Sequence, residues 1–385
     1  MLELTSDPIN QYSPVRRTEE STQMRKSPNR HDLALPVRGK RRRTSAARRV
    51  VVGSMMAFAL TLTSAITGGA VANAWSPTHG TLQTVFCNSS AGMAPVKLEI
   101  QRAARGGSKY LLLLDGLRAT NDVSGWDKET NAFQQFQNDN INVVMPVGGA
   151  ATFYSDWVGP IGSGLGTMGS SGSSGSVGEA AGSSTNTGYK PMWETFLTKD
   201  MPNCLAGMGM SRTGNAIAGL SMGGSAALTL ANYHRDQFNF AGSFSGYLNN
   251  SAPGMRQGIR LALLSQPPGY NVDNMWGPPW SDLWLRNDPF VFAPQLRGLS
   301  LYISAADGIP GPDTSIHSGL DVYNTVNAMG LEAMALANTR SFQARLWSLG
   351  IPATFDFPAT GVHNWGNWQA ELWKARPQIL AAVGA

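Results

Sequence analysis

The stretch Ala216-Ile217-Ala218-Gly219-Leu220-Ser221-Met222-Gly223-Gly224 joins an apolar run to a segment of small and apolar residues that continues to Tyr233. Residues 216–220 predict a buried strand, and residues 225–233 predict a helix. Gly219 and Gly223 stand two residues before and two after Ser221, which is the G-x-S-x-G spacing. A serine on so tight a strand-to-helix turn crowds its neighbours, and glycine relieves the crowding. The stretch therefore predicts Ser221 as a nucleophile held on a sharp turn.

Other apolar runs repeat this alternation along the chain. They predict strands at residues 96–100, 109–114, 141–146, 240–244, 301–304 and 354–357. Helical segments, such as residues 192–199, fall between most of them. Strands alternating with helices predict a mostly parallel central sheet flanked by helices, and the serine motif at a strand end specifies the α/β-hydrolase fold.

Two segments depart from the alternation. Residues 162–188 are dominated by Gly and Ser and predict a flexible surface loop. Residues 250–298 are rich in Pro and Trp and lie between two core strands. We expect them to form an insertion over the active-site end of the sheet.

The first 74 residues are predicted to be a basic leader and secretory signal peptide. They carry twelve Lys or Arg and five Asp or Glu, followed by an apolar stretch at residues 50–71 and then Ala72-Asn73-Ala74. A basic region, an apolar region and small residues form the pattern of a cleaved export signal. We expect cleavage after Ala74, leaving residues 75–385 as one domain that is secreted or kept in the cell envelope. The alternative is an uncleaved membrane anchor.

The basic charge of the chain belongs to this leader. The whole sequence has 30 Lys or Arg and 25 Asp or Glu, but residues 75–385 hold 18 basic and 20 acidic residues, a net charge of −2. We therefore predict no nucleic-acid partner.

The only two cysteines, Cys87 and Cys204, both follow the leader. In an oxidising compartment they are expected to form a disulfide, with two buried thiols as the alternative.

A nucleophilic serine needs a histidine base, and in this fold the base follows the last strand. The sequence has five histidines, and His363 is the one in the loop after residues 354–357. His31 lies in the leader and His79 precedes the nucleophile. His234 is expected to cap the helix that starts at Ser221, and His317 is expected to be solvated.

The acid that orients the base should follow the strand at residues 301–304. The loop there contains Asp307 and Asp313. Asp307-Gly308 suits a turn in which the aspartate bonds its own backbone, so Asp313 is the preferred acid and Asp307 the alternative.

An oxyanion hole is expected from two backbone N–H groups, those of Met222 and Leu117. Leu117 lies in the loop after the strand at residues 109–114, beside Arg118, which is a candidate for binding substrate hydroxyls. The sequence contains no metal-binding or nucleotide-binding motif, and we predict no cofactor and no metal.

Several stretches resemble the antigen 85 mycolyltransferases of mycobacteria and their corynebacterial relatives. They are residues 113–119, 125–127, 145–149, 153–157, 193–198, the serine motif, 275–278, 286–289 and 363–365. Matches in this order cover nearly all of residues 95–375, which is far more than a shared hydrolase fold requires.

The resemblance implies a substrate and a sugar site. Such enzymes transfer a mycolyl group from trehalose monomycolate to a second trehalose monomycolate or to arabinogalactan, through an acylated serine. By likeness, Leu117, Arg118, His363, Asn364 and Trp365 line the sugar site, and Asn249 stands where the family has an Asp. We expect the insertion at residues 250–298 to border a lipid groove. We also expect the protein to be a monomer that makes peripheral contact with cell-envelope lipid.

The resemblance leaves the acid open. It implies a Glu after a Pro-Asn pair, whereas this chain has Pro310-Gly311-Pro312-Asp313. Two other functions remain as alternatives: a secreted carboxylesterase with the same three residues, and a non-catalytic cell-wall or host-binding protein.

Overall fold

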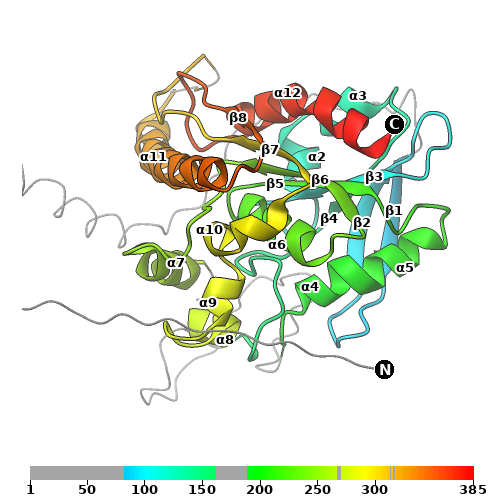
Figure 1. The fold of residues 1–385 in the computed structure, drawn as a ribbon, viewed down its shortest axis with the longest axis horizontal. Helices are drawn as coiled ribbons and strands as arrows, with labels where there is room; N and C mark the ends of the chain where they lie inside the picture. The colour runs from blue at the N-terminus through cyan, green and yellow to red at the C-terminus, as the bar shows by residue number, and fades with distance from the viewer. Residues whose placement is uncertain (1–81, 162–188, 267–269, 313, 315–316) are drawn as a thin grey trace, which may run out of the picture. The chain divides into compact units, whose positions relative to one another are not determined.

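Eight strands form a single, mostly parallel sheet in the order β1-β2-β4-β3-β5-β6-β7-β8 (Figure 1). The computed structural model describes residues 82–161, 189–266, 270–312, 314 and 317–385. The strands are β1 Leu82–Cys87, β2 Val96–Gln101, β3 Tyr110–Leu114, β4 Asn142–Pro146, β5 Asn215–Leu220, β6 Phe238–Phe244, β7 Ser300–Ser304 and β8 Thr354–Asp356. Strands β1, β2 and β4 pair antiparallel in that order, and all remaining pairs are parallel.

The seven predicted strands are all present, with ends shifted by at most two residues. β1 was not predicted. It is an edge strand that pairs only with β2, and most of its side chains are partly or fully exposed. An edge strand of this kind lacks the continuous apolar run that marks the central parallel strands.

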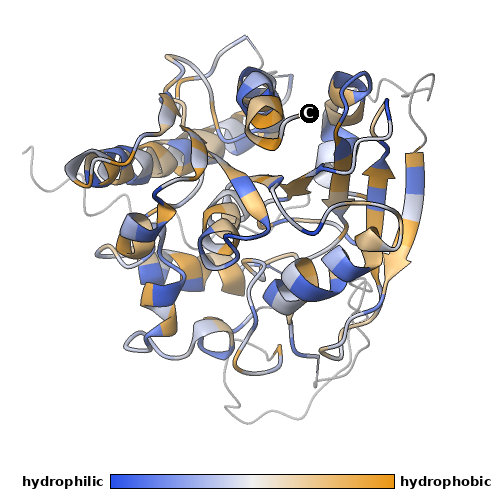
Figure 2. Ribbon diagram, turned by 45° about the vertical axis from the view of Figure 1, so that its right-hand side comes forward, coloured by the Kyte–Doolittle hydropathy of each residue, from blue (hydrophilic) through white to orange (hydrophobic). Residues whose placement is uncertain are grey.

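Alternate side chains of the strands point into two separate cores. On β3, Leu111 and Leu113 face one core, and Leu112 and Leu114 face the other. The first core is covered by α2 Gly125–Glu129, α3 Ala132–Phe136 and α12 Trp365–Val383 (Figure 1). Colouring by hydropathy shows apolar stretches in the central strands, as burial on both faces favours (Figure 2).

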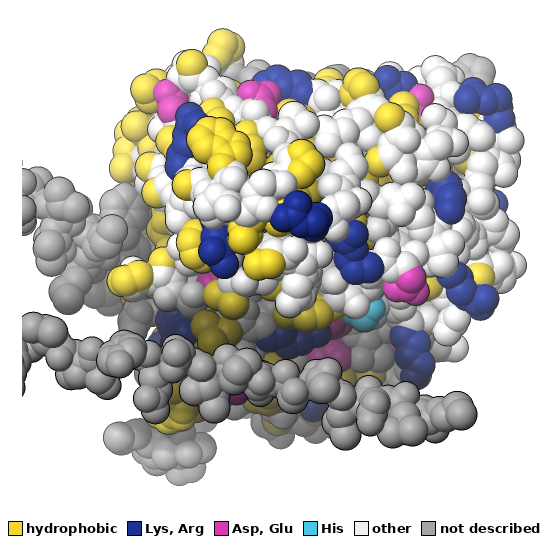
Figure 3. Space-filling view, viewed as in Figure 1, with side chains coloured by type: hydrophobic (Ala, Val, Ile, Leu, Met, Phe, Trp, Pro, Cys, Tyr) yellow, Lys and Arg dark blue, Asp and Glu magenta, His cyan; other side chains and the backbone are white. Residues whose placement is uncertain are grey.

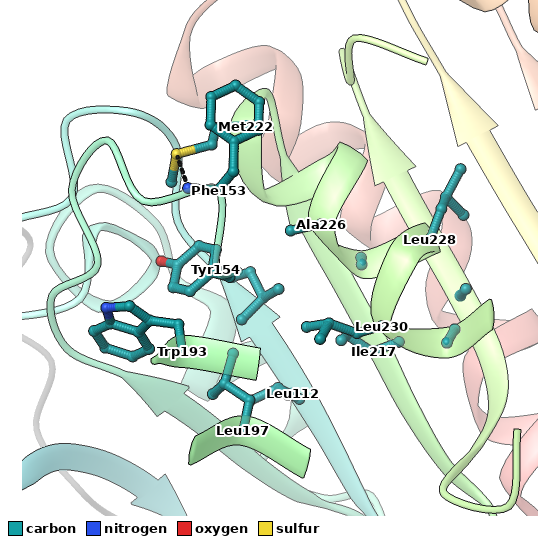
Figure 4. Close-up of a cluster of buried hydrophobic side chains, with 14 of the residues drawn as sticks. Leu112, Phe153, Tyr154, Trp193, Leu197, Ile217, Met222, Ala226, Leu228 and Leu230 are labelled. Carbon is teal, nitrogen blue, oxygen red and sulfur yellow. Dashed lines mark hydrogen bonds between the residues drawn. The ribbon is translucent and has the colours of Figure 1, made fainter. Parts of the chain in front are cut away.

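The opposite face is covered by α4 Trp193–Thr195, the π-helical turn Phe196–Asp200, α5 Met201–Ala206 and α6 Met222–Tyr233. There Leu112 and Ile217 of the sheet meet Ala226 and Leu230 of α6 (Figure 4). This contact fixes the start of α6, and with it Ser221, against the carboxyl ends of β3 and β5.

Two further groups of helices follow β6. The segment at residues 250–298 contains α7 Met255–Leu264, α8 Val272–Trp276, α9 Leu283–Arg286, α10 Pro289–Phe292 and the 3-10 helix Ala293–Leu296.

Helix α11, Gly319–Ser348, begins where the Ser318 side chain accepts a hydrogen bond from the N–H of Asp321. Among the side chains of α11, Leu320, Val322, Val326 and Trp347 are exposed. Hydrophobic side chains also gather on the side of the molecule where α11 lies, whereas Lys and Arg are scattered over the visible face (Figure 3).

The predicted disulfide between Cys87 and Cys204 is confirmed, with a Cα–Cα distance of 5.9 Å. It ties the end of β1 to α5 across 117 residues of sequence. The predicted leader at residues 1–74 and the predicted Gly/Ser loop at residues 162–188 lie outside the described residues. Within the described ranges, no helix is both long enough and apolar enough to span a bilayer.

Candidate active site

Ser221 lies on a sharp turn between β5 and α6. Its backbone has φ 52° and ψ −120°, an unusual conformation for a residue with a side chain. Its N–H donates to the carbonyl of Phe244 on the neighbouring strand at 2.8 Å, which fixes the turn to the sheet. The strand, the turn and the helix predicted from the sequence are all present.

The two glycines of the motif are required by close backbone contacts. A Cβ on Gly219 would lie 2.4 Å from the carbonyl carbon and oxygen of Gly223. A Cβ on Gly223 would lie 2.3 Å from the carbonyl oxygen of Asp115, at the end of β3. Because both obstacles are backbone atoms, a rotamer change cannot relieve either clash.

Replacing Gly223 by alanine is therefore expected to destabilise the fold by about 1–3 kcal/mol and to displace the turn that holds Ser221. Urea unfolding would show the lower stability, and the rate of Ser221 labelling by a phosphonate would show the displaced turn. Gly258→Ala is the matched control, because nothing lies within 4 Å of a Cβ at that helical position. Equal stability of the two variants would contradict the expected clash.

The imidazole of His363 bridges two side chains from distant parts of the chain. Its Nε2 lies 2.9 Å from Oγ of Ser221, and its Nδ1 lies 2.8 Å from Oε2 of Glu332. A carboxylate only accepts hydrogen bonds, so Nδ1 carries the proton and Nε2 accepts from the serine hydroxyl. The structure thus joins Ser221, His363 and Glu332 in the arrangement of a nucleophile, a base and an orienting acid.

The position of the acid corrects the sequence prediction. The carboxylate beside His363 comes from Glu332 in the middle of α11, not from the loop after β7. Asp307 accepts a hydrogen bond from the N–H of Ile309 two residues later, the local turn that Asp307-Gly308 suggested. Asp313 lies outside the described residues.

One sequence signal for Glu332 was available. It is the only charged residue between Asp321 and Arg340, and its neighbours are Leu331 and Ala333. An isolated carboxylate in an otherwise uncharged stretch of helix indicates a buried acid with a specific partner.

The carboxylate of Glu332 is fully buried and satisfied on both oxygens. Its Oε1 accepts from the N–H of Ala306 at 2.7 Å, from Oγ of Ser245 at 2.8 Å and from Nδ2 of Asn367 at 3.4 Å. Ser245 is itself held by Nε1 of Trp368 at 3.0 Å. These donors leave Oε2 aimed at His363, so the acid is fixed before any substrate arrives.

The two backbone N–H groups predicted for an oxyanion hole, those of Met222 and Leu117, lie near Ser221. Met222 is the first residue of α6, where the N–H has no acceptor within the helix. The loop that carries Leu117 lies close by, since a Cβ on Gly116 would be 3.6 Å from the Cβ of Ser221. In the described part of the chain, the N–H of Leu117 donates to no other group. Both N–H groups are therefore available to an oxyanion.

Asp115 holds the loop in which Leu117 lies. Its buried carboxylate accepts from the N–H of Gly125 at 2.9 Å and from the N–H of Trp126 and the hydroxyl of Ser124 at 3.3 Å. Burial raises the pKa of Asp115 to about 7, while these hydrogen bonds oppose the rise. The loop is thereby fastened at both ends, to β3 and to the start of α2.

The predicted sugar-binding residues have different surroundings. Arg118 is exposed, and no ion pair with it occurs in the described ranges. Asn249 donates to the hydroxyl of Ser341 on α11 at 3.4 Å. The side chain of Asn364 caps α12 by accepting from the N–H of Asn367 at 3.0 Å. Trp365 packs edge-on against Trp126, with ring centroids 5.6 Å apart.

Asn364 and Trp365 fix the start of α12, directly after His363, so their contacts support the base.

The segment at residues 250–298 contacts Phe153, and Phe153 in turn contacts Met222, the residue after Ser221. Trp276 contacts the ring of Phe153 at 5.0 Å between centroids, and the N–H of Phe153 donates to the sulfur of Met222 (Figure 4). Of the three tryptophans in this segment, Trp276 and Trp284 are buried, and Trp280 is 83% exposed. Only Trp280 presents an apolar ring to the outside.

The remaining described histidines lie in other surroundings. His234 follows the last residue of α6, as predicted, and its Nε2 lies 3.0 Å from Glu194. Arg286 binds the same carboxylate at 2.6 Å, and together the two partners hold the pKa of Glu194 below its usual value despite burial. His317 is exposed. Over the residues that the structure describes, no group of three His, Cys, Asp or Glu side chains is arranged to hold a metal ion.

Comparison with known proteins agrees with this geometry. Residues 94–379 match the family model described as putative esterase. The diacylglycerol acyltransferase/mycolyltransferase Ag85B of Mycolicibacterium smegmatis is 35% identical over 345 residues, which cover 88% of this chain and 97% of that protein.

The chain belongs to the Ag85 mycolyltransferase family. Another family member, Ag85C of Mycobacterium leprae, is 37% identical over 288 residues, covering 74% of this chain and 77% of that protein. Among solved structures, Mycobacterium tuberculosis MPT51 (FbpC1) aligns with a TM-score of 0.63 and 27% identity, covering 79% of this chain and 99% of that one. These matches confirm the predicted resemblance, the α/β-hydrolase fold and membership in a family of acyltransferases.

Proposed function

We propose that this chain transfers a mycolyl group from trehalose monomycolate to a second trehalose monomycolate or to arabinogalactan, through an ester on Ser221. The observation that carries the proposal is the hydrogen-bonded series from Ser221 through His363 to Glu332, placed at the nucleophile turn. Family membership supports the acyl group, and the exposed guanidinium of Arg118 beside Leu117 supports a sugar ligand. The predicted leader supports action outside the cytoplasm.

The geometry supports a two-step transfer. In the first step, His363 Nε2 takes the proton of the Ser221 hydroxyl while Oγ bonds to the acyl carbon of the donor ester. The charge that develops on the carbonyl oxygen is stabilised by the N–H groups of Met222 and Leu117. The intermediate then expels the trehalose oxygen, which takes the proton from His363. The acyl group is left on Ser221.

The second step reverses these roles with a different hydroxyl. The acceptor sugar gives its proton to His363 Nε2, and its oxygen bonds to the acyl carbon. The bond from that carbon to Oγ of Ser221 breaks, and Oγ recovers the proton. Glu332 holds the imidazole in the required tautomer during both steps and stabilises its positive charge.

The decisive experiment is incubation of residues 75–385 with trehalose monomycolate, followed by separation of the products. We expect the diester and free trehalose, with both absent for Ser221→Ala. Parallel reactions with arabinogalactan and with diacylglycerol would identify the preferred acceptor. Free mycolic acid without a diester would overturn the transferase proposal.

Free mycolic acid without a diester is the product expected of the second candidate function, a carboxylesterase. The match of residues 94–379 to the putative esterase model favours this candidate. The two functions share Ser221, His363 and Glu332 and differ in whether water or a sugar hydroxyl attacks the acyl-enzyme. A binding protein without catalysis would show no phosphonate labelling of Ser221, contrary to what the hydrogen bond to His363 leads us to expect.

A further inference from the structure

The segment just after β4, residues 148–154 and called the β4 loop below, has an unusual backbone. Five of its residues have positive φ: Gly148 at 103°, Gly149 at 84°, Ala151 at 57°, Phe153 at 52° and Tyr154 at 47°. The last three carry side chains, for which this region is unfavourable. Such a backbone persists only where the surrounding contacts hold it, and it is concentrated at functional sites. The conformation of the β4 loop therefore points to a functional role.

The β4 loop is bonded to the chain on both sides of one predicted oxyanion donor, the N–H of Leu117. The hydroxyl of Tyr154 accepts a hydrogen bond from the N–H of Asp115 at 3.1 Å. The N–H of Ala151 donates to the carbonyl oxygen of Leu117 at 3.0 Å. The peptide that carries the Leu117 N–H lies between these two bonds, so the β4 loop fixes its position.

The direction of this N–H is fixed by the same peptide. Its carbonyl oxygen belongs to Gly116 and accepts from the N–H of Ala119 at 3.2 Å. A peptide unit is planar, and its N–H and C=O point in opposite directions. The N–H of Leu117 therefore points away from Ala119 and remains available to an oxyanion.

The phenol of Tyr154 is itself held firmly. Its hydroxyl donates to the carbonyl of Gly148 at 3.3 Å, and its ring packs edge-on against Trp193 with centroids 5.3 Å apart. The ring also lies over Gly149, where an added Cβ would be 2.6 Å from Cε1 of Tyr154. Burial raises the pKa of Tyr154, so the phenol keeps its proton. The hydroxyl is thus a fixed acceptor for the N–H of Asp115.

The second predicted oxyanion donor belongs to a residue that the same loop contacts. The N–H of Phe153, next to Tyr154, donates to the sulfur of Met222 at 3.2 Å (Figure 4). Met222 supplies the other N–H and directly follows Ser221. One short segment with a constrained backbone therefore contacts both residues of the predicted oxyanion hole.

We propose that the β4 loop sets the geometry of the oxyanion hole, and that Tyr154 is its main positioning residue because its hydroxyl holds the N–H of Asp115 two residues before Leu117. Tyr154 touches neither substrate nor the reacting atoms. The inference rests on Ser221 being the nucleophile, as in the proposed function, but not on the identity of the acyl group or of the acceptor.

The test is Tyr154→Phe, which keeps the ring against Trp193 and removes only the hydroxyl. The probe is a butyl trifluoromethyl ketone. Oγ of Ser221 bonds to its carbonyl carbon, the serine proton passes to His363, and the carbonyl oxygen becomes an oxyanion in the hole. The matching secondary alcohol cannot form this bond and measures binding of the chain alone. Turnover of p-nitrophenyl butyrate is measured beside them.

Removing an oxyanion donor outright slows an enzyme by about 10²- to 10³-fold, and displacing one should cost part of that. For Tyr154→Phe we expect kcat to fall about 10-fold and the Ki of the ketone to rise about 10-fold, with KM and the Ki of the alcohol changed less than twofold. A role in stability alone would not separate the ketone from the alcohol.

Tyr302→Phe is the matched control. Its hydroxyl is also buried but donates to Glu371 at 3.0 Å, on the α12 side of the sheet. This variant should lose some stability and keep kcat and the Ki of the ketone. All variants are compared below their Tm.

Met222→Leu tests the other contact independently. It conserves the volume of the buried side chain and removes the sulfur that accepts from Phe153. We expect the Ki of the ketone to rise about threefold, the effect of a weak hydrogen bond. This variant decides the matter if Tyr154→Phe does not fold, and an unchanged Ki would then overturn the inference.

With a folded Tyr154→Phe protein, three results would overturn the inference: kcat and the Ki of the ketone within twofold of the unmodified chain, an equal change in Tyr302→Phe, or an equal rise in the Ki of the alcohol. Failure of the proposed function would look different. If the unmodified chain binds the ketone no better than the alcohol, Ser221 is not the nucleophile and both proposals fall. Tight ketone binding without a mycolyl diester changes the substrate and leaves the role of Tyr154 intact.

Discussion

Replacing Glu332 by glutamine is expected to lower kcat for acyl transfer by roughly 10³- to 10⁴-fold, with little change in KM. Glutamine keeps the shape of the side chain and removes its charge. The positive imidazole that forms when His363 takes the serine proton then has no counter-charge. An amide nitrogen turned toward Nδ1 would also favour the wrong tautomer of the ring. Diester formation from trehalose monomycolate is the measurement, and circular dichroism checks the fold.

Asp313→Asn and Asp307→Asn are the matched controls for this prediction. Both change an Asp of the loop after β7, where the sequence alone placed the acid, and both should keep activity within a few-fold of the unmodified chain. Among the residues that the structure describes, the Asp307 carboxylate accepts a hydrogen bond only from its own turn. Loss of activity in Asp313→Asn together with an active Glu332→Gln protein would show that Asp313, not Glu332, orients His363 in solution.

Removing the disulfide with Cys87→Ser and Cys204→Ser together is expected to lower the free energy of unfolding by about 4 kcal/mol. The bond closes a loop with a sequence separation of 117 residues, so its loss frees a large part of the unfolded chain. It also releases the edge strand β1, whose only sheet partner is β2. For a domain of this size, such a loss corresponds to a drop in Tm on the order of 10 °C.

Guanidinium unfolding of the oxidised protein and of the double variant measures this difference. The unmodified chain under reducing conditions provides an independent comparison, because it lacks the bond without a change in sequence. Equal unfolding midpoints for all three samples would mean that β1 and α5 are held by packing alone. The disulfide joins β1 to α5, and neither element contains Ser221, Glu332 or His363. We therefore expect the double variant to keep its activity at temperatures well below its Tm.

Much of the fold was predictable because its signals are local. The central parallel strands are buried on both faces, so each appears as a continuous apolar run. The turn at Ser221 has glycines at the two positions where backbone atoms leave no room for Cβ, and that requirement is visible as a spacing. His363 was found for a related reason, since the loop after the last strand is where the fold places a base.

Strand pairing and side-chain contacts between distant parts of the chain could not be predicted from local sequence. β1 is half exposed and is defined by its pairing with β2, not by an apolar pattern. The helix cap made by Asn364 and the contact of Trp365 with Trp126 join residues that are far apart or whose partners the sequence does not mark, and neither was predicted. Whether a polar or aromatic side chain is engaged by its neighbours depends on which elements meet it in space.

The sequence by itself was enough to predict Ser221 as nucleophile, His363 as base and the class of fold, because each prediction depends on residues that are adjacent or lie at a strand end. Only the tertiary structure decided the acid. Glu332 lies thirteen residues into α11, far from either partner in the chain, and nothing in the spacing between Ser221, Glu332 and His363 fixes their contact. It reaches His363 because α11 is held where the N–H of Ala306 and the hydroxyl of Ser245 bind its other oxygen. A buried charge is stable only where such partners converge, and that convergence is a property of the folded chain.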